Sequence, residues 1–322
     1  MRRASALIAT ASLLLAALTG CSSSADAASS CVAPISDGAA SKLVTVSDNL
    51  GAVPKVDFPT PLMTGATQGR VIVPGSGDRL VTGQQAKIEL NVYNGTTGSP
   101  IQVSKYDSTS ANVLTLNDQT IKGITDGLAC AQAGSRIAVV VSPDDAFGPQ
   151  GGNPTLGIAA TDSLVFVIDV VKTYLLRANG ADQTPVNGLP AVVLDGNGTP
   201  GITIPGGTPP ADLQVAVLKK GTGDTVKEGD TVTVHYTGVL WAEKKVFDSS
   251  WTKGAPAQLL AVDGSKTQGG VVPGFATAII GQTVGSQVLT VVPPAKGYGD
   301  AVQGTIPAGS TLVFVIDILG IG

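Results

Sequence analysis

Residues 234–250, VHYTGVLWAEKKVFDSS, decide the fold of the region around them. In the strand predicted over residues 231–237, apolar side chains stand at positions 232, 234 and 236, and polar ones at 231, 233 and 235. One face of this strand is therefore apolar, and the other can meet water. Gly238 breaks the alternation, and a turn then leads to Phe247 and Asp248. An aromatic ring on an apolar strand face, followed by this Phe-Asp pair, predicts an apolar pocket.

Four more motifs follow this stretch in an order and at spacings that suit one small domain. They are Val271-Val272-Pro273-Gly274-Phe275, Gly297-Tyr298-Gly299, Ile306-Pro307 and Leu312-Val313-Phe314. Together the five motifs resemble the FKBP-type peptidyl-prolyl isomerases, the macrolide-binding immunophilins. The resemblance covers residues 212–322, about a third of the chain.

Strand patterns dominate this part of the chain. Residues 191–194, 231–237, 287–292 and 311–319 are rich in Val, Ile, Thr and Leu and are bounded by Gly or Pro. One short helix is predicted from Pro273, with Phe275, Ala278 and Ile279 on one face and Gly281 at its end. These patterns predict an α+β fold, a curved antiparallel sheet packed on one short helix, which is also the fold that the resemblance implies.

The chain also contains an internal repeat. Gly75-Ser76-Gly77-Asp78 corresponds to Gly221-Thr222-Gly223-Asp224, and the hexapeptide LVFVID occurs at residues 164–169 and again at 312–317. The offsets of 146 and 148 residues indicate two copies of one domain with small insertions or deletions. We therefore expect two FKBP-like domains, residues 41–177 and 185–322, joined by a linker at 178–184.

In the family that the motifs resemble, the proline ring of the substrate enters a hydrophobic cavity floored by an aromatic residue of the helix. By this resemblance, the expected catalytic residues are Tyr236, Phe247, Asp248 and Tyr298. The expected substrate-binding residues are Val271, Val272, Phe275, Ile306 and Phe314. Each aromatic residue alone is more simply explained as core, but Asp248 beside Phe247 and Tyr298 between two glycines are poor core choices.

Such a cavity suits prolyl isomerisation, because an amide that rotates through its twisted state loses resonance and becomes less polar. No nucleophile or proton shuttle is required. Tyr298 is expected to donate a hydrogen bond to a substrate carbonyl, with the backbone N–H of Val272 or of Ile306 as a further anchor. Asp248 is expected to orient Tyr236 or to polarise the edge of the pocket.

Two substitutions depart from the family pattern. Phe275 stands where many members have Trp, which exchanges one aromatic floor for another. Ala257 stands where an aromatic wall is common, and this opening bears on the affinity for macrolides more than on activity.

The first copy departs further. Leu90, Ile124 and Phe147 fall at the positions of Tyr236, Phe275 and Tyr298, while Tyr106-Asp107-Ser108 matches Phe247-Asp248-Ser249 only after a shift. We expect this copy to lack the pocket, and either to bind clients or to position the active copy.

Residues 1–20 have the pattern of an export signal. Arg2 and Arg3 precede an apolar stretch that is too short to span a bilayer comfortably. The stretch ends in Leu18-Thr19-Gly20-Cys21, which resembles a bacterial lipobox, so Cys21 is expected to be lipidated and residues 21–40 to form a tether. The alternative is cleavage after Ala27, which would remove Cys21.

Export would place Cys31 and Cys130 outside the cytoplasm, where a disulfide would persist. Their spacing leaves open whether they form a disulfide or remain two thiols.

The charge and the remaining motifs exclude other classes of function. The formal net charge is -4, and loss of the signal with its two arginines makes it -6, which disfavours nucleic acid as a partner. His235, the only histidine, points away from Tyr236 and is expected to be solvated or satisfied rather than a catalytic base. The ligands of a zinc site are missing, and neither a metal nor a cofactor is expected.

These observations predict an extracytoplasmic, lipid-anchored peptidyl-prolyl cis-trans isomerase that assists the folding of exported proteins. Its expected partners are proline-containing polypeptides, with macrolides as further candidate ligands. The alternative is a non-enzymatic surface chaperone or binding scaffold built on two FKBP-like domains.

Overall fold

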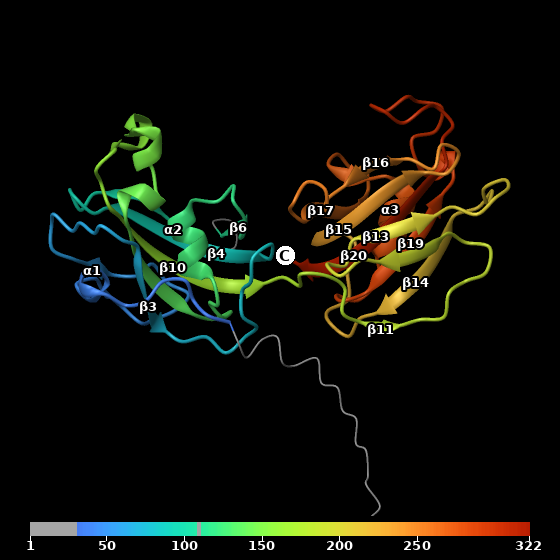
Figure 1. Ribbon diagram of the computed structural model, residues 1–322. Coiled ribbons are helices and arrows are strands. Elements are labelled where there is room, and N and C mark those ends of the chain that lie inside the picture. The colour runs from blue at the N-terminus through green and yellow to red at the C-terminus, as the bar shows by residue number, and fades with distance from the viewer. Residues whose placement is uncertain (1–30, 108–110) are drawn as a thin grey trace, which may run out of the picture. The chain divides into compact units, whose positions relative to one another are not determined.

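The computed structural model describes residues 31–107 and 111–322, which contain two copies of one strand order (Figure 1). The predicted signal segment, the lipidation site Cys21 and Ser108 lie outside the described residues. Within the two described ranges, no helix is long and apolar enough to span a membrane.

The first copy contains the six-stranded sheet β3-β7-β10-β4-β5, in which β6 also pairs with β4. Its strands are β3 (Gln68–Val73), β4 (Gln85–Asn94), β5 (Pro100–Val103), β6 (Asn112–Thr115), β7 (Arg136–Val141) and β10 (Leu164–Thr173). The helix α2 (Lys122–Leu128) packs on β7, and β8 (Gly152–Asn153) pairs with β9 (Ile158–Ala159) in a separate small sheet.

The second copy has the strand order β11-β14-β19-β20-β15-β17-β18, with β16 on β15. Its strands are β11 (Ala181–Asp182), β14 (Gln214–Lys220), β15 (Thr231–Leu240), β16 (Val246–Ser249), β17 (Ala257–Asp263), β18 (Gly270–Val271), β19 (Gln287–Val292) and β20 (Leu312–Ile321). Every pairing is antiparallel except β17 with β18. The helix is α3 (Pro273–Ile279), so the predicted antiparallel sheet with one short helix is confirmed.

The register of the strands confirms the internal repeat. Ile168 lies opposite Leu90 in the first copy, just as Ile316 lies opposite Tyr236 in the second. The strand orders correspond as well, since β3, β7, β10 and β4 match β14, β19, β20 and β15. The alignment of Leu90 with Tyr236 therefore follows from the structure as it did from the sequence.

Each copy has a hydrophobic core between its helix and one face of its sheet. In the second copy the predicted helix face is buried, with Phe275, Ala278 and Ile279 all at most 3% exposed. Gly274 allows the helix to lie close to the sheet, because a Cβ on Gly274 would come within 2.5 Å of the Val292 side chain. Gly123 has the same relation to Val141 in the first copy.

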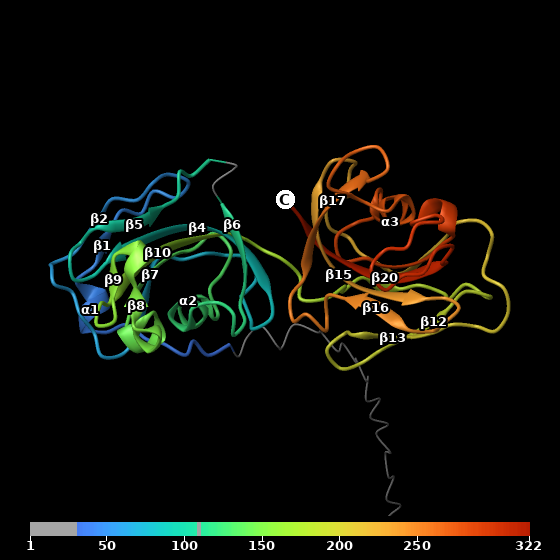
Figure 2. The same cartoon turned by 90° about the horizontal axis from the view of Figure 1, so that it is seen from above.

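The second face of the sheet is buried too, which corrects the expectation that it meets water. Thr233 is 1% exposed and His235 5%. A hairpin of β12 (Ala191–Leu194) and β13 (Pro200–Thr203) covers part of this face, on the side opposite α3 (Figure 2), and the Trp251 ring stacks on His235. In the first copy, the covering elements are α1 (Ala39–Lys42), β1 (Thr45–Val46) and β2 (Val56–Asp57).

The expected linker also makes ordered contacts with the second copy. Ala178 donates its N–H to the Asp317 carboxylate at 2.8 Å, and Gly180 donates to the Gly285 carbonyl at 2.9 Å. Strand β11 then pairs with β14. Residues of the expected linker are thus part of the hydrogen-bonded structure of the second copy.

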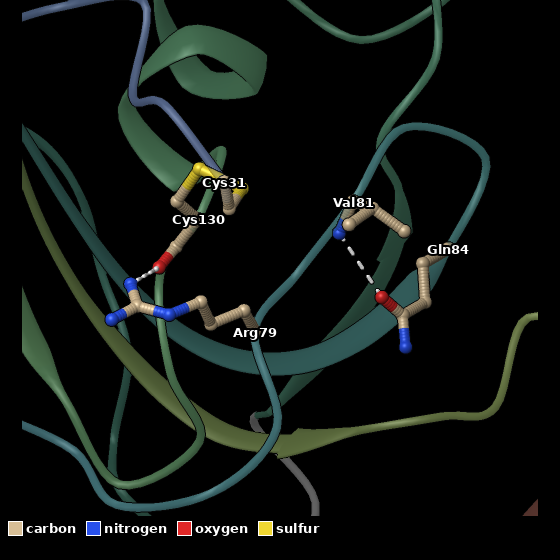
Figure 3. The surroundings of a disulfide bond; sticks show 5 residues. All are labelled: Cys31, Arg79, Val81, Gln84 and Cys130. Atoms are coloured by element: carbon tan, nitrogen blue, oxygen red, sulfur yellow. Dashed lines mark hydrogen bonds between the residues drawn. A yellow bond between two sulfur atoms is a disulfide. The ribbon is translucent and has the colours of Figure 1, made fainter. Parts of the chain in front are cut away.

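Cys31 and Cys130 form a disulfide, which decides the alternative that their spacing left open. Figure 3 shows the bond close to Arg79, which donates to the Cys130 carbonyl at 3.2 Å. The disulfide ties the start of the described chain to the segment just after α2.

Candidate functional site

A cavity of about 630 Å³ opens in the second copy, between α3 and the sheet. Eight of the nine predicted catalytic and substrate-binding residues line it: Tyr236, Phe247, Asp248, Val271, Val272, Phe275, Tyr298 and Phe314. They come from β15, β16, β18, the start of α3, the segment after β19, and β20. Side chains that are far apart in sequence therefore converge on one apolar space.

Four aromatic rings form a continuous series around this cavity. The ring centroids of Tyr236 and Phe275 lie 6.0 Å apart, those of Phe275 and Phe314 5.1 Å, and those of Phe314 and Phe247 5.6 Å. Every pair is close to perpendicular, which is a favourable arrangement for aromatic quadrupoles. Each ring thereby packs against the next, and together they line the apolar side of the cavity.

Gly238 makes room for the Phe247 ring. A Cβ on Gly238 would lie 2.5 Å from the ring's Cζ atom. Gly238 pairs with Asp248 across β15 and β16, so the ring folds back over the strand at this glycine. The break in alternation seen in the sequence thus has a structural cause.

Asp248 links Tyr236 to Lys253. The Tyr236 hydroxyl donates to Asp248 Oδ2 at 2.6 Å, and Lys253 Nζ lies 2.5 Å from Oδ1. Partial burial raises the pKa of Asp248, but the hydrogen bonds from Lys253 and Tyr236 outweigh it and hold that pKa below its usual value. Burial, and then the hydrogen bond to Asp248, raise the pKa of Tyr236 far above its ordinary value. Near neutral pH, Asp248 is therefore a carboxylate and Tyr236 a neutral donor.

Tyr298 lies at the mouth of the cavity and is 37% exposed. Its hydroxyl has no hydrogen-bond partner in the described part of the chain, so it is available to a ligand. Burial, and then the negative charge of Asp248, raise the pKa of Tyr298, so its hydroxyl keeps its proton at neutral pH.

The two predicted backbone anchors differ. The Ile306 N–H donates to the Gln303 carbonyl at 2.9 Å, and the Ile306 side chain belongs to the core rather than to the cavity lining. The Val272 N–H, at the entrance to α3, donates to no other residue in the described ranges. Of the two groups, only the Val272 N–H is free to bind a substrate carbonyl.

The sequence interpretation missed part of the lining. Leu259 comes from β17, while Gly264, Ser265 and Gly270 flank the loop between β17 and β18. A β-strand pattern at residues 257–263 could have indicated Leu259. Ala257 is half-buried against the core and is not part of the lining.

The equivalent region of the first copy lacks this arrangement. Opposite Val92, where the second copy has Gly238, the strand pairing places Gln102, so Ile101 and Gln102 occupy the positions of Phe247 and Asp248. The proposed match of Tyr106-Asp107 with Phe247-Asp248 is therefore wrong. A valine at position 92 leaves no room for a ring folded over the strand, and the smaller Ile101 packs on the core instead.

Ile124 is buried in the first copy's core, and Phe147 is half-buried against it. The nearby cavity, of about 740 Å³, has a different chemical character, with Lys122, Asp126 and Asp145 among its lining residues. Across the described ranges of both copies, no group of three or more His, Cys, Asp or Glu residues could hold a metal ion.

Comparisons with known proteins match both copies. A family described as FKBP-type peptidyl-prolyl cis-trans isomerase matches residues 77–171 and 223–319. An FK506-binding protein of Streptomyces anulatus is 36% identical over 124 residues, which cover 38% of this chain and 96% of that protein. FK506-binding protein 1 of Debaryomyces hansenii is 40% identical over 114 residues, or 35% of this chain and 96% of that protein. The FKBP-type peptidyl-prolyl cis-trans isomerase FkpA of Escherichia coli is 36% identical over 109 residues, or 34% of this chain and 37% of that protein.

Proposed function

Because the chain belongs to the FKBP-type peptidyl-prolyl cis-trans isomerase family, we propose that the cavity of its second copy binds and isomerises proline residues of polypeptides. One observation carries this assignment: four mutually packed aromatic rings enclose an apolar space that has the Tyr236–Asp248 pair, the Tyr298 hydroxyl and the free Val272 N–H at its border. A proline ring matches the apolar space, and peptide carbonyls match the two donors.

The cavity lowers the rotation barrier by its polarity and its geometry. Uncatalysed rotation about an X-Pro bond must cross about 18–20 kcal/mol. The planar amide is more dipolar than the twisted one, so apolar walls disfavour the ground state more than the transition state. A reduction of about 5 kcal/mol would give nearly four decades in rate.

The polar groups orient the substrate within these walls. We assign the Val272 N–H to a carbonyl of the bound peptide and the Tyr298 hydroxyl to a second one. Asp248 keeps Tyr236 in place through their hydrogen bond, and Lys253 keeps Asp248 charged. The reaction requires no covalent intermediate, and protein groups supply every interaction in this assignment.

A pair of matched variants of the full chain tests the site. Phe247→Ala removes a cavity wall, and Ile101→Ala truncates the residue at the equivalent position of the first copy. Loss of a ring contact of about 1.5 kcal/mol or more predicts at least about a tenfold fall in kcat/KM on a proline peptide, with Ile101→Ala unchanged. Equal activity of both variants and the wild type would refute the assignment.

The relatives' names suggest a second ligand for the same cavity, the macrolide FK506. We propose that FK506 competes with peptide for this apolar cavity. Inhibition by FK506 that Phe247→Ala weakens supports this proposal, and inhibition that Phe247→Ala leaves unchanged contradicts it.

We also propose that the enzyme works outside the cytoplasm on exported proteins, attached to the membrane through Cys21. The apolar signal pattern, the lipobox-like LTGC sequence and the Cys31–Cys130 disulfide support this location, because disulfides persist in oxidising compartments. The first copy, with no aromatic cavity, would bind clients or position the active copy.

A further inference from the structure

Tyr236 is held at both ends by one short segment of chain. Its hydroxyl donates to Asp248, and its backbone N–H donates to the Oγ of Ser250 at 2.8 Å. The Ser250 N–H in turn donates to the Tyr236 carbonyl at 3.0 Å. Both backbone polar groups of Tyr236 are thus satisfied by Ser250, at the point where the pairing of β15 with β16 ends.

Ser250 also begins the turn that carries Lys253. Thr252 closes this turn by donating from Oγ1 to the Ser249 carbonyl at 2.9 Å, and Gly254 donates its N–H to the Trp251 carbonyl at 3.2 Å. Lys253, two residues beyond Trp251, reaches back to Asp248. Ser250 therefore lies between Asp248, which accepts from the Tyr236 hydroxyl, and Lys253, which pairs with Asp248.

His235 and Trp251 fix Ser250 from the other face of the sheet. Nδ1 of His235 lies 2.8 Å from Ser250 Oγ, and the imidazole stacks on the Trp251 ring at a centroid distance of 3.9 Å and an interplanar angle of 17°. His235 is 5% exposed and Ser250 1%, so water does not compete for these bonds. The histidine is satisfied here, as the sequence analysis allowed.

The first copy has the same serine without the rest of the arrangement. Ser104 accepts from the Leu90 N–H at 3.0 Å and donates its own N–H to the Leu90 carbonyl at 3.2 Å. Glu89 stands where His235 does, and Lys105 where Trp251 does. The serine bridge is thus a general feature of the fold, whereas the histidine and tryptophan that fix it occur only beside the aromatic cavity.

Building on the proposed function, we propose that Ser250, fixed by His235 and Trp251, is a positioning residue for isomerisation: it holds Tyr236 and Asp248 in the geometry that shapes the cavity. Ser250 does not line the cavity and acts only through these two residues. The Ser250 hydroxyl accepts a hydrogen bond from the Tyr236 backbone N–H and also bonds to His235 Nδ1. A methyl group in its place could make neither bond.

The test compares Ser250→Ala with Ser104→Ala in the full chain. The two changes remove equivalent backbone bridges from the two copies, so Ser104→Ala controls for the loss of stability that follows from losing such a bridge, measured as the free energy of unfolding. We expect Ser250→Ala to lower kcat/KM on a proline peptide by about tenfold, since small displacements of positioned groups slow catalysis strongly. We expect Ser104→Ala to stay within about twofold of wild type, and Ser250→Thr, which keeps the hydroxyl, to recover most of the activity.

A second readout does not depend on turnover. The ¹³Cζ resonance of Tyr236 reports the hydrogen bond of its hydroxyl, and we expect this resonance to shift in Ser250→Ala and to stay in place in Ser104→Ala. Should Ser250→Ala fail to fold, Ser250→Cys keeps the volume with a weaker hydrogen-bonding group, and the same shift and loss of rate are expected.

The outcomes separate this inference from the proposed function. An active wild type with Ser250→Ala as fast as Ser104→Ala, or with Tyr236 unshifted, overturns the positioning role and leaves the isomerase assignment standing. A folded wild type without activity overturns the proposed function and, with it, the catalytic meaning of Ser250, whatever the Tyr236 resonance shows.

Discussion

At the scale of single residues, the cavity depends on a glycine as much as on its rings. Gly238 lies under Phe247, and the first copy, with Val92 at that position, has Ile101 in place of the ring. The two positions change together between the copies because they share one volume. Gly238 is therefore needed to form the site, although it has no side chain of its own.

Substitution of this glycine tests that dependence. Gly238→Ala would place a methyl group about 2.5 Å from the Phe247 ring, which must then leave the cavity wall. We expect loss of stability of about 1–3 kcal/mol from overpacking together with lower kcat/KM, measured by urea unfolding and a proline-peptide assay. The double variant Gly238→Ala/Phe247→Ala should be more stable than Gly238→Ala alone. If the second change restores no stability, the two residues do not compete for space.

The residues that sequence reasoning could find are those whose chemistry is unusual for their place. Asp248 beside a phenylalanine and Tyr298 between glycines stand out in the sequence, and both line the cavity. Ile306 was also predicted to line the cavity but lies in the core. The sequence could not show this, because an apolar residue near a pocket can equally face the core. Ser250 carries no such mark, since its role depends on hydrogen bonds to a strand 14 residues away.

At the scale of elements, the alternation in β15, the Val-, Ile-, Thr- and Leu-rich runs of β19 and β20, and the apolar face of α3 were sufficient to predict these elements. The second face of the sheet was predicted to meet water because Thr233 and His235 are polar. The hairpin on this face was only half predicted: residues 191–194 read as a strand and form β12, whereas β13 lies in a Gly- and Pro-rich stretch whose composition is typical of a linker. The register of β5 on β4 makes Ile101 the first copy's equivalent of Phe247. Composition does not reveal this register either.

The burial of His235, whose ring stacks on Trp251, predicts a dependence of stability on pH. Burial lowers the pKa of His235 from 6.5 to about 4. Between these two values the unfolded chain binds the proton and the folded chain does not, so stability falls as the pH drops from about 6.5 to 4, by up to about 3 kcal/mol. Asp317, opposite His235, acts in the other direction because burial raises its pKa.

Comparison of the wild type with His235→Asn separates the effect of His235 on stability from that of the other titrating groups. We expect the free energy of unfolding of the wild type to fall more steeply below pH 6.5 than that of His235→Asn, which places an amide near the Nδ1 position and does not titrate. Urea unfolding at intervals from pH 7 to 4.5 measures both slopes. Parallel curves would show that His235 does not remain neutral in the folded state.

At the scale of the whole molecule, one fold serves two chemically different copies. The family match covers both, but the aromatic rings and the Tyr236–Asp248 pair occur in the second copy. The disulfide joins Cys31 to the first copy, and Cys21 lies ten residues earlier in the sequence. Ten residues reach at most about 35 Å, so a lipid on Cys21 would keep the first copy near the membrane surface.

Membrane attachment has a direct test. Cys21→Ser removes the sulfur to which the first acyl group would be joined, so we expect the lipidated form to disappear. Either an uncut precursor that keeps its apolar segment or a secreted form that begins near Ala28 should replace it. Mass spectrometry of the wild-type N-terminus identifies the route. An unmodified wild-type chain that starts at Ala28 would contradict the lipoprotein proposal and leave the isomerase assignment intact.

The central claim, that isomerase activity belongs to the cavity of the second copy, is tested most directly by giving that copy the residues of the first. The triple variant Tyr236→Leu, Phe247→Ile and Tyr298→Phe introduces the residue types of Leu90, Ile101 and Phe147 without changing the length or charge of the chain. In a proline-peptide assay on the full chain, we expect kcat/KM to fall by at least about a hundredfold, because two walls and a hydrogen bond are lost together. A folded triple variant that isomerises the peptide as fast as the wild type would contradict the account.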